Sequence, residues 1–90
     1  MLVVPSDNFN KSVSKIKDKI ALNRLKVLVN KLEQAHNLKE ISNVKSVVNS
    51  PNIYRIRTGD YRLFVLYRDG EITILLLTYK KKNEKTYNEF

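Results

Sequence analysis

The fold is decided by residues 53–79, which read IYRIRTGDYRLFVLYRDGEITILLLTY. Apolar and polar residues alternate through much of this stretch, as they do in strands that bury one face. The Asp-Gly pair at 69–70 is a strong signal for a two-residue hairpin turn. The predicted strands cover 53–57, 61–68 and 71–79, and the predicted turns lie at Thr58-Gly59-Asp60 and Asp69-Gly70.

Three arginines of this stretch are predicted to share one face of the sheet. Side chains alternate between faces along a strand, so Arg55 and Arg57 point the same way. The turn at 58–60 brings Arg62 back beside them. A single strand Arg is usually just a solvent-facing residue, but three that converge with only Asp60 nearby form a site for a polyanion. A phosphodiester backbone is the best candidate, because the Arg fork binds phosphate in a bidentate way.

The residues before this stretch predict a short strand and two helices. Leu2-Val3-Val4 reads as a strand that ends at Pro5, and Ser6-Asp7-Asn8 offers helix N-caps. Apolar residues then recur with a helical period to about residue 35. One helix over about 8–35 would be roughly 42 Å long, which is too long for a small domain. Two helices that fold back on each other, with a turn near 18–22, are therefore predicted.

The periodic apolar residues define the buried faces of these helices. Those of the first helix are Phe9, Val13, Ile16 and Ile20, and those of the second are Leu22, Leu25, Leu28, Val29, Leu32 and Ala35. Residues 36–52 are polar and loop-like, with a possible helical turn near Leu38–Ile41. The pattern as a whole predicts a single α+β domain over residues 1–90, in which a helical hairpin packs on a twisted antiparallel sheet.

Composition limits the function further. The 90 residues carry 17 Lys and Arg against 9 Asp and Glu, for a net charge of +8, which favours nucleic acid, an acidic protein or an anionic membrane surface. Cys is absent and His36 is the single His, so Cys- or His-based metal sites are excluded. No cofactor motif is present. The N-terminus lacks signal-peptide features and no apolar run approaches about 20 residues, so a cytoplasmic protein without a membrane anchor is expected.

The C-terminal residues add a second set of cations and a phenol. Lys80, Lys81 and Lys82 are followed by Lys85 and Tyr87. On composition alone this segment reads as a solvated tail. Beside the three arginines, it would instead extend the basic surface.

In its basic strands and the order of its elements, the chain resembles the RelE/ParE superfamily of toxins from type II toxin–antitoxin systems. The resemblance lies in Tyr54-Arg55-Ile56-Arg57, in Gly59-Asp60-Tyr61-Arg62-Leu63, in the segment 80–87 and in the order of the predicted elements. The RelE branch cuts messenger RNA in the ribosomal A site, with basic residues on the second and third strands and a basic residue and a Tyr near the C-terminus.

This resemblance implies a set of site residues. The catalytic residues would be Arg57, Arg62, Lys81 and Tyr87, and the RNA-binding residues Arg55, Lys80 and Lys82. The nucleophile would be the 2′-OH of the RNA itself, without a metal. A guanidinium stays protonated, so neither Arg55 nor Arg57 can remove the proton. Our hypothesis gives Tyr87 the role of general base, since nearby cations would lower its pKa, or else the role of stacking on a nucleotide.

The resemblance also implies partners and leaves alternatives open. The expected partners are an acidic antitoxin and mRNA in the ribosome, with operator DNA reached only through the antitoxin. The ParE branch poisons DNA gyrase and lacks this nucleolytic set, so a gyrase-inhibiting toxin is one alternative. A nucleic-acid-binding module, or an inactive toxin kept for its antitoxin, is the other.

Overall fold

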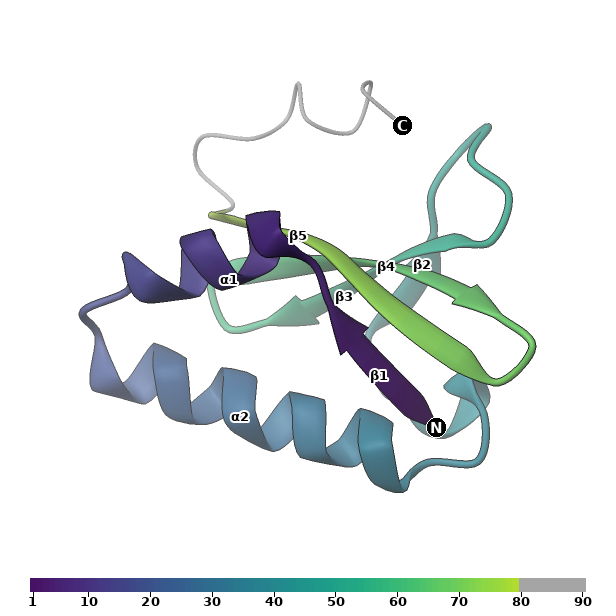
Figure 1. Ribbon diagram of the computed structural model, residues 1–90, viewed down its shortest axis with the longest axis horizontal. Helices are drawn as coiled ribbons and strands as arrows, with labels where there is room; N and C mark the ends of the chain where they lie inside the picture. Colours follow the sequence, from purple (N-terminus) through teal and green to yellow (C-terminus); the bar gives the residue numbers. More distant parts are fainter. Residues whose placement is uncertain (80–90) are drawn as a thin grey trace.

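The computed structural model describes residues 1–79 as a five-stranded sheet with two helices (Figure 1). The strands lie in the order β1-β5-β4-β3-β2. In chain order the elements are β1 (Leu2–Pro5), α1 (Asp7–Ser14), α2 (Lys19–Gln34), the 3₁₀ helix η1 (Leu38–Glu40), β2 (Val44–Ser46), β3 (Ile53–Thr58), β4 (Tyr61–Arg68) and β5 (Glu71–Tyr79). Strands β2 to β5 pair antiparallel and β1 pairs parallel with β5, which confirms the predicted α+β class.

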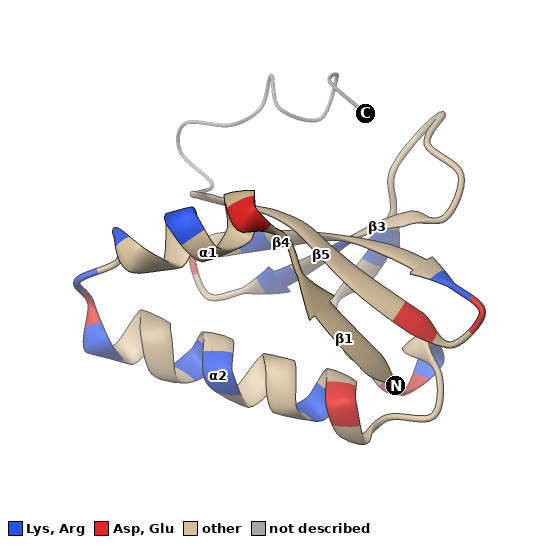
Figure 2. Ribbon diagram, in the orientation of Figure 1, with Lys and Arg blue, Asp and Glu red and all other residues tan. Residues whose placement is uncertain are grey.

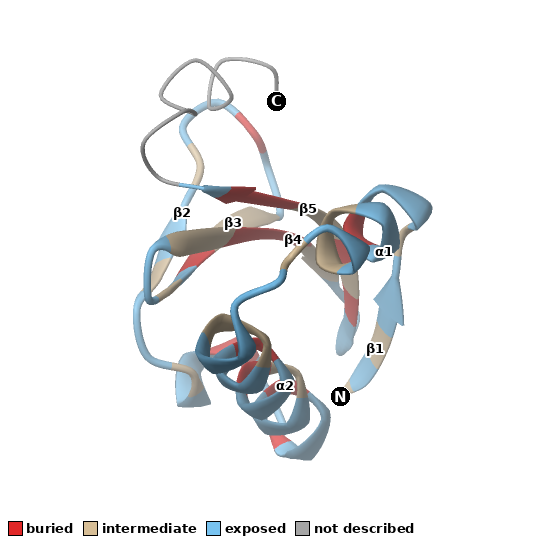
Figure 3. Cartoon of the chain, turned by 90° about the vertical axis from the view of Figure 1, so that its left-hand side faces the viewer, coloured by how far each residue is buried: buried red, intermediate tan, exposed pale blue. Residues whose placement is uncertain are grey.

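One face of the sheet carries the core. Leu25, Leu28 and Leu32 recur at steps of three and four on α2, and this side of the helix is buried. The sheet residues that pack in the same cluster are Ile56, Leu63, Val65, Ile72, Ile74 and Leu77, joined by Phe9 from α1. Figure 3 shows α2 beneath the sheet. Within residues 1–79, the two helices therefore lie on the same face of the sheet.

The helix boundary lies earlier in the chain than predicted. Helix α1 ends at Ser14, and Asp18 caps α2 by accepting hydrogen bonds from the N–H groups of Ile20 and Ala21. The Asp side chain accepts from backbone N–H groups that, in one continuous helix, would donate to carbonyl groups of the preceding turn. The prediction that Ile20 belongs to the first helix was wrong, since it lies in α2 with 67% of its surface exposed.

The polar region 36–52 contains more structure than predicted. The 3₁₀ helix η1 (Leu38–Glu40) confirms the predicted helical turn. Strand β2 (Val44–Ser46), in contrast, lies where a loop was predicted. It has only three residues, and it exists because it pairs with β3. Pairing of this kind depends on residues distant in the sequence and leaves little local pattern.

Ser6 ties the first helix to the sheet. Its Oγ accepts a hydrogen bond from the N–H of Phe9 at 3.1 Å and donates one to the carbonyl of Leu75 at 2.8 Å. Its backbone N–H donates to the carbonyl of Ile74 at 2.9 Å. The start of α1 is therefore held against β5, at a point where β5 is irregular. Ser6 is also one of the predicted N-cap residues.

Candidate functional site

The β3–β4 hairpin places Arg57 directly opposite Arg62. The two strands are joined by Gly59 and Asp60, and Gly59 has a φ of +61°. A positive φ at the first central residue is typical of a type II′ turn, which Gly adopts at the least cost. The short turn fixes the register, so Arg62 returns beside Arg57 as the sequence predicted.

The three arginines lie on the face of the sheet away from the helices. Ile56, between Arg55 and Arg57, is fully buried in the core, and so is Leu63, next to Arg62. Alternation then puts the arginine side chains on the opposite face. Arg57 is exposed, whereas Arg55 and Arg62 are half-buried. The structure thus brings together the three predicted arginines.

A β-bulge in β5 completes this face. Ile74 and Leu77 both belong to the core although they are three residues apart, which strict alternation does not allow. The register shifts between Phe64 and Val65 of β4, and one extra residue of β5 is accommodated there. Beyond the bulge Thr78 lies opposite Arg62, so that Arg57, Arg62 and Thr78 form one row across three strands.

A second row lies beside the first and contains a cation that the sequence analysis missed. Lys45 of β2 is opposite Arg55 of β3, which is opposite Phe64 of β4. Lys45 therefore shares the face of the arginines and is exposed. The signal that would have revealed it is the alternation of Val44, partly buried against the core, with Lys45 and Ser46. Three residues were too few to stand out as a strand.

A small hollow opens at the end of this basic face. Its lining is Arg57, Gly59, Tyr61 and Arg62, and its volume is about 170 Å³. Arg57 forms no ion pair with any residue of the described range 1–79. Tyr61 belongs to the core side, where its ring lies 5.2 Å from that of Tyr79, between centroids. Two guanidinium groups at one hollow suit a ligand with several anionic oxygens.

The remaining predicted site residues lie outside the described part of the chain. They are Lys80, Lys81, Lys82 and Tyr87.

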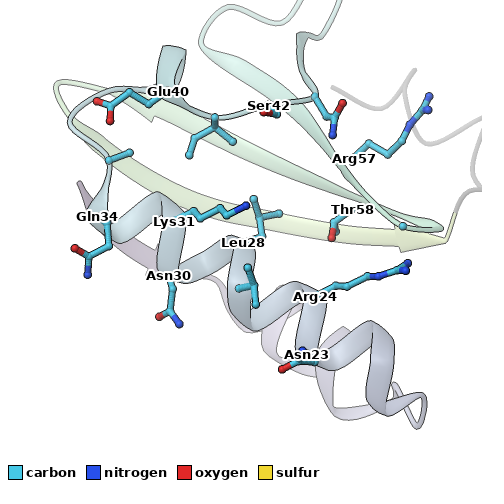
Figure 4. A pocket seen from close by; sticks show the side chains of 15 residues that line it. Asn23, Arg24, Leu28, Asn30, Lys31, Gln34, Glu40, Ser42, Arg57 and Thr58 are labelled. Carbon is cyan, nitrogen blue, oxygen red and sulfur yellow. The ribbon is translucent and has the colours of Figure 1, made fainter.

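A larger groove runs beside the β3–β4 turn, between α2 and the segment that enters β2 (Figure 4). Its volume is about 780 Å³. Arg24 from α2 and Arg57 from β3 lie at the same end of it, and Lys31 extends into it from α2. Figure 2 shows Lys and Arg on α2 as well as on the strands. Arg24 and Lys31 were not among the predicted site residues, and the groove brings both of them into one lining with Arg57.

Metal-ligand clusters and helices long and apolar enough to span a membrane are both absent from residues 1–79. No group of three or more His, Cys, Asp or Glu side chains is placed to hold a metal ion there. None of the helices in this range has the length and apolar character needed to cross a bilayer.

Comparison with known families identifies the chain. The model of the ParE toxin of the type II toxin–antitoxin system parDE matches residues 3–83. The chain belongs to this toxin family. It is therefore a toxin of the RelE/ParE superfamily, as the basic strands and the order of the elements predicted. Curated protein sequences give no significant match.

Solved structures of RelE proteins share the fold of this ParE-family toxin. A chain of the RelB–RelE antitoxin–toxin complex from Methanococcus jannaschii matches with a TM-score of 0.78 and 20% identity, covering 97% of this chain and 98% of that chain. The RelE–RelB complex from Pyrococcus horikoshii gives 0.71 and 23%, with 91% and 97% covered. Isolated RelE toxin from E. coli gives 0.67 and 19%, with 98% and 92% covered. At these identities the likeness establishes the fold.

Proposed function

We propose that this toxin is a ribosome-dependent endoribonuclease that cuts mRNA. The observation that carries the proposal is the row in which Arg57 lies opposite Arg62, with Arg55 and Lys45 in the next row of the same face. Four cations on one sheet face match the repeated charges of a phosphodiester backbone. The match of the toxin family model to residues 3–83 suits a single toxin domain over 1–90.

The proposed reaction uses the RNA's own nucleophile. The 2′-oxygen attacks the adjacent phosphorus as its proton is removed, the bond from phosphorus to the 5′-oxygen breaks, and that oxygen takes up a proton. The products are a 2′,3′-cyclic phosphate and a free 5′-hydroxyl. The protein has to align the attack and stabilise charge on the phosphorane, and donors already fixed in place supply most of that effect. No metal is required by this chemistry.

Each residue receives a role in the proposal. Arg57 and Arg62 stabilise the transition state at the hollow they share, and Arg55 holds a flanking phosphate. Lys81 donates the proton to the leaving oxygen, and Lys80 and Lys82 bind RNA. Tyr87 acts as the base or stacks on a nucleotide.

The proposed partners follow from the charge and from the relatives. The RelE structures from M. jannaschii and P. horikoshii are complexes with RelB. A matching antitoxin for this chain would be acidic, because a net charge of +8 attracts and steers an acidic segment. Operator DNA would be reached only through that antitoxin. The ribosome as target places the action of the toxin in the cytoplasm.

A second candidate function is inhibition of DNA gyrase without catalysis. It is favoured by the family model, whose description is that of the ParE toxin of parDE systems. The ParE branch is associated with gyrase rather than with the nucleolytic residue set.

One pair of assays separates the two candidates. The purified toxin is added to a translating extract, where cut mRNA is mapped by primer extension, and to a supercoiling reaction with gyrase. We expect cuts within translated codons, none in free mRNA, and unchanged supercoiling. Loss of supercoiling with intact mRNA would instead assign the toxin to the gyrase-inhibiting class. Arg68→Gln, at the far end of β4, is a matched control that lowers the charge outside the site.

A further inference from the structure

The groove between α2 and β3 is continuous with the basic face of the sheet. Arg57 and Gly59 line both the 780 Å³ groove and the 170 Å³ hollow that contains Arg62. A ligand chain that leaves the hollow at Arg57 therefore enters the groove directly. The next cations that it meets are Arg24 and Lys31, both from α2.

Arg24 lies at this junction, beside the β3–β4 turn. A Cβ added to Gly59 would lie 2.8 Å from Nη1 of Arg24, so the guanidinium lies against the glycine backbone. A Cβ at this position would force the end of the Arg24 side chain to shift. The guanidinium of a helix arginine thus lies next to the β3–β4 turn, although Arg24 and Gly59 are 35 residues apart in the sequence.

The lining of the groove has the chemistry of a nucleic acid site. Arg24, Lys31 and Arg57 face a single acidic residue, Glu40. Most of the other lining side chains are amides and hydroxyls: Asn23, Asn30, Gln34, Ser42, Asn43 and Thr58. Side-chain amides hydrogen-bond to the edges of unpaired bases, and Arg and Lys bind phosphates.

We propose that this groove binds single-stranded RNA that flanks the cleaved phosphate. Arg24 and Lys31 contact the phosphates, and the amides of α2 and of the segment before β2 contact the bases. Val27, which is 44% exposed, offers an apolar surface to a base face. An acidic peptide is the rival ligand, because four apolar side chains also line the groove: Val27, Leu28, Ala35 and Ile41. The six amide and hydroxyl side chains beside the cations favour RNA over this rival. The proposal rests on the function proposed above and extends it to RNA outside the hollow.

The test is the salt dependence of RNA binding. A fluorescein-labelled 12-nucleotide single-stranded RNA is titrated with the toxin by anisotropy at several salt concentrations. Each phosphate contact to a single strand contributes about 0.7 to the slope of log affinity against log salt. Arg24→Gln combined with Lys31→Gln is therefore expected to weaken binding and to reduce the slope by about 1.4.

A matched control removes the same charge from the same helix. Lys19 and Lys26 are exposed on α2 and do not line the groove. Lys19→Gln combined with Lys26→Gln is expected to keep the slope of the wild type. Equal slope changes in both double variants would show that only bulk charge matters and would overturn the proposal, as would a wild type that does not bind the RNA.

Two further outcomes separate this inference from the nuclease assignment. A deca-glutamate peptide is also tested for its ability to displace the RNA. If the Arg24→Gln and Lys31→Gln double variant binds RNA normally but the peptide no longer displaces RNA from it, the groove serves an acidic protein and the proposal fails. If the slope falls as expected while the wild type leaves mRNA intact in a translating extract, the groove stands and the nuclease assignment fails. Thermal unfolding of both double variants verifies that neither loses the fold.

Discussion

Arg57 and Arg62 are a pair of like charges held directly opposite each other by the β3–β4 register. Directly opposed side chains have Cβ atoms about 4.5–5.5 Å apart, and like charges in this position are unfavourable for folding. The fold accepts this cost at the edge of a hollow that suits an anionic ligand. Such a conflict between local stability and charge placement is expected at functional sites.

This conflict predicts opposite effects on stability and activity. Arg57→Gln removes one of the two like charges from an exposed position. We expect the free energy of unfolding to stay the same or to rise by about a few tenths of a kcal/mol. Cleavage of mRNA on the ribosome should fall about 100- to 1000-fold, because one donor to the transition state is lost.

Urea denaturation and single-turnover cleavage measure these two quantities. Arg68→Gln, which removes a charge at the far end of the paired strand β4, should leave cleavage unchanged. A clear loss of stability in Arg57→Gln would mean that Arg57 is a structural residue.

Tyr87 allows a test of its chemical role with two substitutions. Tyr87→Phe removes only the hydroxyl. If Tyr87 is the base, cleavage collapses in this variant; if the ring stacks on a nucleotide, the variant stays nearly as active, because stacking needs only the ring. The rate of cleavage on programmed ribosomes is the measurement, and full activity in Tyr87→Ala would leave this residue without a role.

At the scale of elements, the two helix caps differ in what they hold. Asp18 caps α2 from an exposed loop and contacts only its own helix. Ser6 caps α1 and also donates to the carbonyl of Leu75 beside the bulge of β5. The bulge in turn sets which face Thr78 occupies in the row of Arg57 and Arg62. The first helix cap therefore supports the site through β5.

This difference predicts unequal costs for the two alanine substitutions. Asp18→Ala should cost about 1 kcal/mol of stability, the usual value for an N-cap. Ser6→Ala should cost about 1 kcal/mol more, because a second hydrogen bond is lost and the Leu75 carbonyl loses its donor. Chemical denaturation of both variants gives the comparison, and equal costs would show that the bond to Leu75 contributes nothing.

Local pattern predicted much of the sheet. The strands at 53–58, 61–68 and 71–79 agree with the sequence to within one residue, and the turn at Asp69-Gly70 has positive φ at both residues, as a type I′ turn requires. The shared face of the arginines followed from alternation alone. These features depend on neighbours in the sequence, and for this reason they could be predicted from it.

Features that depend on pairing between distant parts of the chain could not be predicted from the sequence. Strand β2 and its Lys45 need β3 beside them, and the parallel pairing of β1 with β5 joins residues about 70 positions apart. Arg24 reaches the site only because α2 packs where Gly59 turns. The predicted turn between the helices lies a few residues later than the observed one, because Ile16 and Ile20 continue the apolar period past the end of α1.

At the scale of the whole molecule, the charge is divided between two working surfaces. The face of the sheet away from the helices carries Lys45, Arg55, Arg57 and Arg62, and the groove beside α2 carries Arg24 and Lys31. The core cluster occupies the helix-covered face of the sheet, and these cations lie on the opposite face. The helix-covered face of the sheet therefore holds the core, and the opposite face holds the cations of the proposed function.

The most direct test of this account is the chemistry of the cut on programmed ribosomes. Purified toxin is mixed with ribosomes that carry a defined mRNA codon in the A site, and the rate and the 3′ end of the product are measured for wild type and Arg62→Ala. We expect a single cut in that codon and a 2′,3′-cyclic phosphate at the 3′ end of the product. In a folded Arg62→Ala variant, the rate should be about 100- to 1000-fold lower. Equal rates for the two proteins, or an mRNA left whole by the wild type, would contradict it.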